Sequence, residues 1–339
     1  MFKLIQNNKY HFCTHFSSAY IPQGVALILS IKKNYPDSII WILPLDEMTK
    51  LTLTELRIEK VYILDSGVAS ELFSNFHKFC STRNFAEAVF SIKPQFIEYV
   101  VQKSQEKEIT FYLDADTFLF APFELPVDSE EPSIFLSPHY FTPMSSHSAK
   151  SGKYNAGLVG FRNDTSGREA ARFWSALCEE WCFVVPDSGR YADQKYLEVL
   201  ATQWSTEVAI LSYGNNFGTW SFAENMQIES KNGNIYIDKK LITSFHFHGL
   251  KISRILLRTG ISMYGYFSNH RKIKKLVYTR YRLGLNSALV LLSRIESDGT
   301  YENRNLIPKV GGLRNFLALV RRRDFMFMTS GLQFRRKHY

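Results

Sequence analysis

The chain of 339 residues is 45% hydrophobic and 15% aromatic, which excludes a disordered or collagenous protein. Its net charge of +9 is uneven, because residues 251–339 carry 19 Lys and Arg against 4 Asp and Glu while the preceding part is acidic. Four cysteines do not make a disulfide framework, and neither a signal peptide nor an apolar run of membrane-spanning length is recognised, so we expect a cytoplasmic location.

The first 66 residues alternate between β-rich runs and helical patterns. We expect strands at 10–16, 39–45 and 61–65 and an amphipathic helix at 21–34. Strands separated by helices of this length pair in parallel with right-handed crossovers, and such sheets bind ligands at the carboxyl ends of their strands. The first of these ends is the segment 13–20.

The middle of the chain extends this α/β pattern. A helical pattern at 84–103 precedes a buried strand at 109–114 that ends in acidic residues. Further strands are expected at 133–138, 156–161, 208–212, 234–237 and 242–248, and helices at 167–184 and 193–202. The sequence therefore predicts one α/β catalytic domain over residues 1–250.

The composition changes near residue 250. Residues 251–284 contain nine Lys or Arg and no acid, interleaved with apolar and aromatic side chains. We predict a basic, mostly helical C-terminal extension over residues 251–339, with an anionic surface as its partner.

Two carboxylates, Asp114 and Asp116, lie where the buried strand ends. Hard oxygen ligands suit Mn²⁺ or Mg²⁺, and a cation bound there would neutralise a departing diphosphate. The same spacing also occurs in turns with solvated acids. A phosphohydrolase of the haloacid dehalogenase type begins with this pattern too, but it requires Thr or Val where this chain has Phe118.

His246 and His248 alternate along a predicted strand and therefore point to the same face. Strand histidines are often core residues, but together with two carboxylates an imidazole suits Mn²⁺. We favour His248 as the ligand and His246 as its support, because Gly249 permits close approach of a diphosphate and Lys251 can supply a point charge to it.

Residues near other strand ends are candidates for binding a nucleotide. The backbone of Thr14 could meet a base edge while Tyr20 stacks on it, or Tyr20 could simply pack as the first apolar residue of its helix. Arg83 offers a planar fork suited to a phosphate or a carboxylate.

Residues later in the chain are candidates for binding a sugar. The Asn155 amide can bond sugar hydroxyls, since the small residues after it let a ligand approach the backbone. Asp193, which is followed by Gln194, could cap the helix that begins there.

The order of these motifs resembles the bacterial GT-A-fold glycosyltransferases, particularly glycosyltransferase family 8 and its near relatives, over residues 9–251. The matching segments are 13–20, Arg83, 112–117, 153–157, 192–194 and 246–251. The last segment departs from the family in its two histidines, its shorter spacing and the lack of Pro-Trp after the lysine.

The resemblance implies a fold and an activity. The fold would be a mixed, mainly parallel sheet flanked by helices, and the donor a nucleotide diphosphate sugar, most simply a UDP-sugar. It implies retention of anomeric configuration, with Asp193 and Gln194 beside the anomeric carbon; an inverting enzyme could instead recruit Asp193 as a base. Asn155 would join them in catalysis. The nucleotide donor would contact Thr14, Tyr20, Arg83, Asp114, Gly249 and Lys251.

The basic clusters at 271–275 and 321–323 suit an interfacial helix on anionic lipid. Nucleic acid would attract the same charges, but the acidic catalytic half argues against a nucleic-acid-binding protein. We expect the inner face of the cell membrane as the partner, because lipid-linked glycan acceptors lie there. The sequence thus predicts transfer of a sugar to a hydroxyl of a glycan or lipid-linked acceptor.

Overall fold

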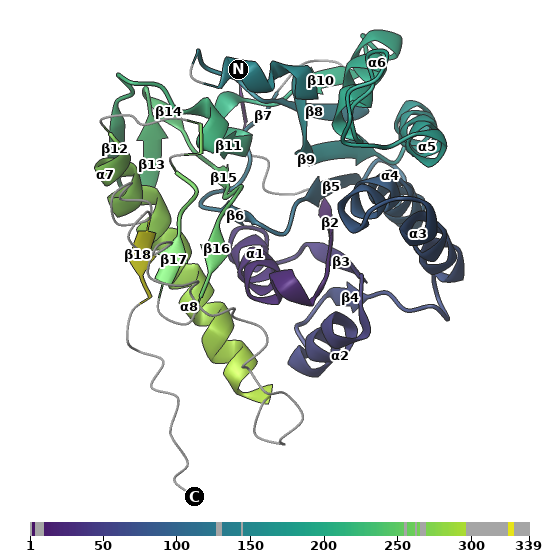
Figure 1. The fold of residues 1–339 in the computed structure, drawn as a ribbon, viewed down its shortest axis with the longest axis horizontal. Helices are drawn as coiled ribbons and strands as arrows, with labels where there is room; N and C mark the ends of the chain where they lie inside the picture. The colour runs from purple at the N-terminus through teal and green to yellow at the C-terminus, as the bar shows by residue number, and fades with distance from the viewer. Residues whose placement is uncertain are drawn as a thin grey trace, which may run out of the picture.

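The computed structural model describes residues 2–3, 10–126, 131–143, 145–253, 256–261, 263–264, 269–295 and 325–328. The basic cluster predicted at 321–323 lies outside these residues. Within them, the chain forms a central sheet with helices packed on both of its faces (Figure 1).

The central sheet has seven strands in the order β10, β8, β9, β5, β2, β3, β4. All neighbours are parallel except β9, which runs antiparallel to both β5 and β8. This confirms the predicted mixed, mainly parallel sheet. The strands are β2 (Tyr10–Phe16), β3 (Ile39–Pro44), β4 (Val61–Ile63), β5 (Ile109–Leu113), β8 (Ile134–Pro138), β9 (Tyr154–Arg162) and β10 (Val208–Ile210).

Helices bury one apolar cluster on each face of this sheet. Successive residues of a strand point to opposite faces, so β2 contributes Phe12 to one cluster and Cys13 to the other. The first cluster is covered by α1 (Ile21–Asn34) and α2 (Glu47–Leu56), and the second by α3 (Ser70–Thr82), α4 (Phe85–Lys103), α5 (Thr165–Glu180) and α6 (Leu197–Gln203). Residues 193–202 therefore form a shorter helix than predicted, preceded by the 3-10 turn Gln194–Tyr196.

A second, three-stranded sheet joins two segments that are far apart in the sequence. It has the order β11 (Phe217–Gly218), β15 (Ser244–His246), β6 (Thr117–Leu119). In the antiparallel pairing of β15 with β6, His246 lies opposite Thr117. The Phe247 amide donates to the Asp116 carbonyl at 2.8 Å. The chain just after β5 is thereby fixed beside the strand that carries the predicted histidines.

Smaller sheets complete the body. β1 (Phe2–Lys3) pairs antiparallel with β7 (Leu125–Pro126). A meander is formed by β12 (Ile228–Lys231), β13 (Asn234–Ile237) and β14 (Lys240–Leu241). Among the residues placed by the structure, no helix is both long and apolar enough to cross a membrane.

The described part of the C-terminal extension packs on the body. It contains the strands β16 (Lys251–Ile252), β17 (Leu256–Arg258) and β18 (Phe325–Phe327), and then α7 (His270–Ile273), a π-helical turn (Lys274–Tyr278) and α8 (Thr279–Ser293). Tyr281 and Leu285 of α8 belong to the same apolar cluster as α1. The extension thus has strands as well as helices and shares the core of the body, while the boundary near residue 250 stays a prediction.

Candidate functional site

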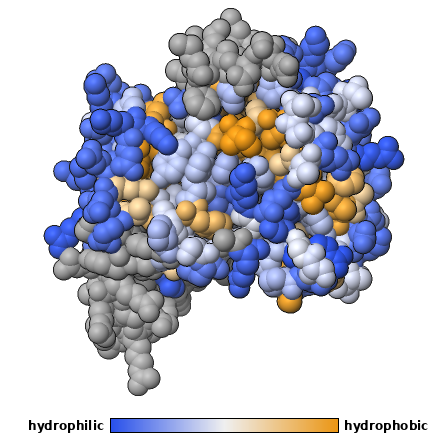
Figure 2. All heavy atoms as spheres, turned by 90° about the horizontal axis from the view of Figure 1, so that it is seen from above, coloured by the Kyte–Doolittle hydropathy of each residue, from blue (hydrophilic) through white to orange (hydrophobic). Residues whose placement is uncertain are grey.

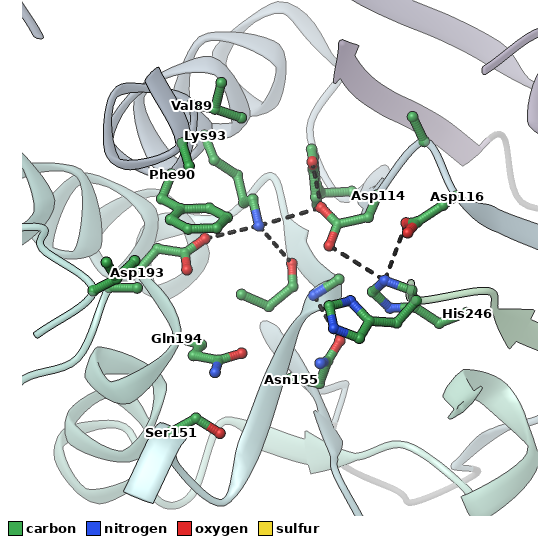
Figure 3. A pocket seen from close by; sticks show the side chains of 18 of the residues that line it. Val89, Phe90, Lys93, Asp114, Asp116, Ser151, Asn155, Asp193, Gln194 and His246 are labelled. Carbon is green, nitrogen blue, oxygen red and sulfur yellow. Dashed lines mark hydrogen bonds and ion pairs between the residues drawn. The ribbon is translucent and has the colours of Figure 1, made fainter. Parts of the chain in front are cut away.

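A pocket of about 640 Å³ opens at the carboxyl ends of the central strands. Its lining includes most of the predicted site residues, namely Tyr20, Asp114, Asp116, Asn155, Asp193, Gln194, His246 and His248. In Figure 3, Asp114 and Asp116 just after β5, Asn155 of β9, His246 of β15, and Asp193 and Gln194 at the 3-10 turn surround the same space. Residues separated by more than 100 positions in the sequence therefore meet in one cavity.

Three of these side chains can hold a metal ion. The ligand atoms of Asp116, His246 and His248 all lie within 4.8 Å of one another. His246 Nε2 is 3.1 Å from Asp116 Oδ1 and 3.8 Å from Asp114 Oδ2. The predicted set was Asp114, Asp116 and His248, with His246 as support; the group of ligand atoms that lie within 4.8 Å of one another contains Asp116 and both histidines. A carboxylate and two imidazoles fit a divalent transition-metal ion such as Mn²⁺.

Electrostatics favour the metal-binding forms of Asp116 and His248, but not that of His246. Burial would raise the pKa of Asp116, but His246 and His248 bring that pKa down to about 2. Burial and the neighbouring His246 lower the pKa of His248. Burial by itself would also lower the pKa of His246, yet the Asp116 and Asp114 carboxylates outweigh it and the pKa is raised. Asp116 is therefore ionised and His248 neutral near pH 7, which are the forms that bind metal ions.

Lys93 of α4 links the two ends of the pocket, and the sequence analysis did not identify it. Its buried ammonium is 3.3 Å from Asp114 Oδ1 and 2.8 Å from Asp193 Oδ2 (Figure 3). Burial opposes its charge, but the two carboxylates raise the pKa of Lys93 overall. The signal that could have revealed it was a lysine on the mainly apolar, buried side of the helix at 84–103, since a buried lysine requires an acidic partner.

The pKa values of the two acids that bind Lys93 are shifted in opposite directions. Burial would raise the pKa of Asp114, but Lys93 and His246 bring it below its ordinary value, and the Tyr112 hydroxyl also donates to Asp114 at 2.7 Å. The pKa of Asp193 is raised, because its burial outweighs the charge of Lys93. The side chain of Asp193 does not cap the following helix, so that part of the prediction was wrong.

Asn155 lies in the pocket wall, but its amide is already engaged. Its Oδ1 accepts from the amide of Gly157 at 2.8 Å and from the side chain of Asn216 at 3.0 Å, and its Nδ2 lies 3.0 Å from His139 Nε2. Asn155 therefore holds the backbone beside Asp114, whose amide donates to the Gly157 carbonyl at 3.0 Å. Gln194 faces the cavity (Figure 3).

Two predicted nucleotide-binding residues do not line the pocket. Arg83 donates to the Ser91 hydroxyl and to the carbonyls of Cys178 and Glu179, so its planar fork ties α4 to α5. Because these donors are used within the protein, the structure does not support the prediction that Arg83 contacts the nucleotide donor. Thr14 is buried inside β2, where it is paired with Ile42 of β3, so its backbone is committed to the sheet.

The predicted donor contacts at the end of the histidine segment also lie outside the lining. Gly249 adopts a left-handed backbone with φ of 78°, which turns the chain after His248. Lys251 is exposed in β16, yet it is near enough to His248 to lower the pKa of that histidine. Tyr20 does line the pocket and is 36% exposed, so its ring is available for stacking.

The chain was compared with known families, curated proteins and solved structures. No protein-family model matches the chain. It is 28% identical over 255 residues to the uncharacterized protein YfnF of Bacillus subtilis, covering 72% of this chain and 82% of that protein. To the uncharacterized protein YfnD of the same organism it is 28% identical over 247 residues, covering 72% and 78%.

Among solved structures, the chain is similar to the galactosyltransferase LgtC in complex with donor and acceptor sugar analogs. The TM-score is 0.50 at 13% identity, with 82% of this chain and 95% of that chain covered. The chain thus has the fold of the GT-A glycosyltransferases, as its motifs predicted.

Proposed function

We propose that this chain is a metal-dependent glycosyltransferase that moves a sugar from a nucleotide diphosphate donor, specifically a UDP-sugar, to a hydroxyl of a glycan or lipid-linked acceptor. The observation that carries the proposal is a single pocket, on a GT-A fold, in which a cation-binding group and the Lys93–Asp193 ion pair lie on either side of Asp114. One end suits a diphosphate, and the other suits a sugar.

At the diphosphate end, Asp116, His246 and His248 would hold the cation. That ion would supply positive charge to the leaving diphosphate. Tyr20, at the mouth of the same pocket, presents an aromatic ring on which a base can stack. Asp114 is kept ionised by Lys93 and is oriented by the Tyr112 hydroxyl, so it adds negative charge beside the cation.

At the sugar end, the Asp193 carboxylate is fixed by Lys93, and its carbonyl accepts from the buried indole of Trp174 at 2.8 Å. A carboxylate fixed in this way is suited to stabilise positive charge that develops on an anomeric carbon. Gln194 follows it and can bond sugar hydroxyls. We include retention of configuration in the proposal, with the anomer of the product as its test.

The proposed acceptor would bind to the apolar part of the pocket lining. Phe85, Val89, Phe90 and Val184 add apolar surface to the lining of the pocket that contains Asp193. Such a surface accommodates the nonpolar faces of sugar rings or an apolar carrier. The GT-A fold argues against the haloacid dehalogenase alternative, which rested on the D-x-D pattern alone.

The proposed membrane partner requires one change from the expectation. Most apolar side chains of α8 are buried against the body, and only Leu283 and Val290 are exposed, so the helix offers little apolar surface to a headgroup layer. The surface around α7 is instead positively charged, because Arg271, Lys272 and Lys275 are exposed. We therefore propose electrostatic association with an anionic, cytoplasmic membrane face.

A thermal-shift and turnover screen tests the proposed activity. UDP-sugars should raise the melting temperature more with Mn²⁺ than with chelator, since a ligand that binds only the folded state stabilises it. Release of UDP should require the metal, and NMR of the product should show the anomer of the donor. If no nucleotide diphosphate sugar stabilises the protein with or without metal, the proposed function is wrong.

A further inference from the structure

We propose that the sugar end of the pocket contains an anion-binding subsite, in which Lys150 binds a carboxylate or a phosphate carried by one of the two sugars. Hydrogen-bond donors from Ser148, Gln194 and Tyr264 complete the subsite, and all four residues line the pocket. Ser148 and Lys150 belong to the 3-10 helix Ser146–Ser151. The inference rests on the function proposed above and narrows its substrates to those in which a sugar is acidic.

The helix that carries Lys150 packs against the turn that begins at Gln194. A Cβ atom built on Gly152 would lie 3.5 Å from the Cα atom of Lys195, so the two segments are in direct contact. Gln194 and Asp116 lie on opposite sides of the pocket (Figure 3). An anion bound beside Gln194 is therefore separate from the place proposed for the donor diphosphate.

The C-terminal extension reaches this end of the pocket through Tyr264. The ring of Tyr264 is 6.1 Å from that of His147 between centroids, so it lies beside the helix that carries Lys150. Burial and the neighbouring Tyr191 raise the pKa of Tyr264, so the phenol keeps its proton and can donate to an anion. This part of the subsite lies outside residues 9–251, the part of the chain in which the glycosyltransferase motifs occur.

Lys150 differs from the lysines near it because its charge has no partner. The Lys195 ammonium is 2.8 Å from both carboxylate oxygens of Glu198, and the Lys153 ammonium lies 5.3 Å from the ring centroid of Tyr154. Lys150 is exposed, and among the residues that the structure describes it has no hydrogen-bond or ion-pair partner. The positive charge of Lys150 is therefore available to a ligand.

The polar groups near Lys150 can also donate to an anion. Within the described part of the chain, neither the Ser148 hydroxyl nor the Gln194 amide has a hydrogen-bond partner. The carboxylate of Asp193, in contrast, is already paired with Lys93 at 2.8 Å. A free ammonium with hydroxyl and amide donors suits a carboxylate or a phosphate, because each hydrogen bond to such a group is strengthened by its charge.

The first test asks whether the anion is on the donor sugar. Calorimetry with Mn²⁺ compares UDP-glucuronate with UDP-glucose, which has a hydroxymethyl group in place of the carboxylate. Wild-type protein should bind the acidic sugar at least about 10-fold more tightly, the effect of one hydrogen bond to a charged group. Lys150→Met should remove this preference and Lys150→Arg should retain most of it. Lys153→Met is the matched control, because Lys153 is exposed and close in sequence but does not line the pocket.

The second test asks whether the anion is on the acceptor. Protein loaded with UDP and Mn²⁺ is titrated with glucose 6-phosphate and with glucose, using the same three variants. A preference of at least about 10-fold for the phosphate that is lost in Lys150→Met would assign the anion to the acceptor sugar. A preference in the first test alone would assign it to the transferred sugar.

The subsite is refuted if neither acidic compound is preferred, or if the preference persists in Lys150→Met. UDP alone should bind wild type and Lys150→Met equally, and weaker binding to the variant would place Lys150 on the donor diphosphate and overturn the proposal. If no UDP compound binds, but glucose 6-phosphate binds wild type and not Lys150→Met, the anion subsite stands and the proposed glycosyltransferase function fails.

Discussion

Gly157 lies in β9 directly against the imidazole of His246. A Cβ atom at this position would come 2.5 Å from His246 Cε1, closer than real contacts allow. Gly157→Ala should therefore displace the ring and weaken Mn²⁺ binding at least about 10-fold, as loss of a positioning contact does at metal sites. The measurement is a titration of the protein with Mn²⁺, followed by the loss of the free-ion electron paramagnetic resonance signal, with circular dichroism to verify the fold.

Gly160 provides the control for a generic effect of crowding this strand. A Cβ atom there would come equally close to the ring of Phe111, which does not line the pocket. Gly160→Ala should lower stability but leave the Mn²⁺ affinity of the folded protein unchanged. Equal losses of affinity in the two variants would refute a specific role for Gly157.

Lys93→Met should destabilise the protein by about 3 to 5 kcal/mol, because it leaves Asp114 and Asp193 buried without their cation. Denaturant unfolding measures this change. Lys150→Met removes an exposed lysine of the same pocket and should cost less than about 1 kcal/mol. Comparable stabilities of the two variants would show that the Lys93 ion pairs contribute little.

His15 makes stability depend on pH. Burial, together with Lys93, lowers the pKa of His15 from 6.5 to about 4. Between these values the unfolded chain binds a proton that the folded chain does not, so this contribution to stability is lost as the pH falls from 6.5 to 4, by at most about 3 kcal/mol. Unfolding free energies at pH 7 and pH 4.5 should therefore differ less in His15→Gln than in wild type, and equal pH dependences would contradict this account.

At the level of residues, the sequence was most informative where the function dictates a spacing. The sequence predicted that the two carboxylates at the end of one strand lie near the two histidines on the face of another, and the structure brings Asp114, Asp116, His246 and His248 into one pocket. The prediction for Arg83 was wrong because one arginine forms no motif with other residues. Its sequence context therefore cannot show whether it binds a ligand or, as in the structure, bridges two helices. Lys93 was missed because its partners, Asp114 and Asp193, are distant in the sequence.

At the level of elements, α4 presents Lys93, Val89 and Phe90 to the pocket and begins with a complete capping box. The Asn84 side chain accepts from the Glu87 amide, and the Glu87 side chain accepts from the Asn84 amide. Asn84→Ala should lower the unfolding free energy by about 1 kcal/mol. Thermal unfolding measures this, with Glu106→Ala on the exposed turn after α4 as the control, and a variant as stable as that control would count against the cap.

The elements that could be predicted were those with a strong local pattern, such as β2, α1 and β5. Helices α2 and α3 were not predicted, and α2 shows why, because its TKLTLTEL segment is rich in β-branched Thr. The helix forms because Asp46 caps it and Leu53 is buried against the sheet. Strand β6 has three residues and forms only by pairing with β15, so a local pattern cannot reveal it.

At the scale of the whole molecule, the exposed basic residues near α7 should govern binding to anionic membranes. Each exposed Lys or Arg near such a surface contributes about 1 kcal/mol at low ionic strength. Changing Arg271, Lys272 and Lys275 together to Ser should therefore abolish most sedimentation with vesicles that contain anionic lipid. Wild-type protein should bind neutral vesicles weakly and be released from anionic ones as salt rises.

A charge-matched variant separates location from net charge. Lys78, Lys103 and Lys107 are exposed on or beside α3 and α4, away from α7 (Figure 1). Changing these three to Ser should leave sedimentation close to that of wild type. If both triple variants lose binding equally, membrane association reflects overall charge and not this surface. Strong competition by oligonucleotides would instead favour nucleic acid as the partner.

Apolar side chains also reach the surface of the molecule in several separate patches, between wide hydrophilic areas (Figure 2). Exposed Phe85 and Val185 illustrate this distribution near the pocket. Patches of this kind are common on folded proteins, so hydrophobicity alone does not identify a partner surface. Charge, which the sequence already shows to be uneven, is the better guide here.

The pairing of β6 with β15 also affects when the proposed cation ligands come together during synthesis. Asp116 leaves the ribosome well before His246 and His248, and the hydrogen bond from Phe247 to Asp116 closes a loop of more than 100 residues. Contacts of such sequence separation form late, because the entropy of closing the loop opposes them until the intervening structure is in place. A nascent chain thus has no complete set of ligands, and capture of the ion would mark the completion of folding.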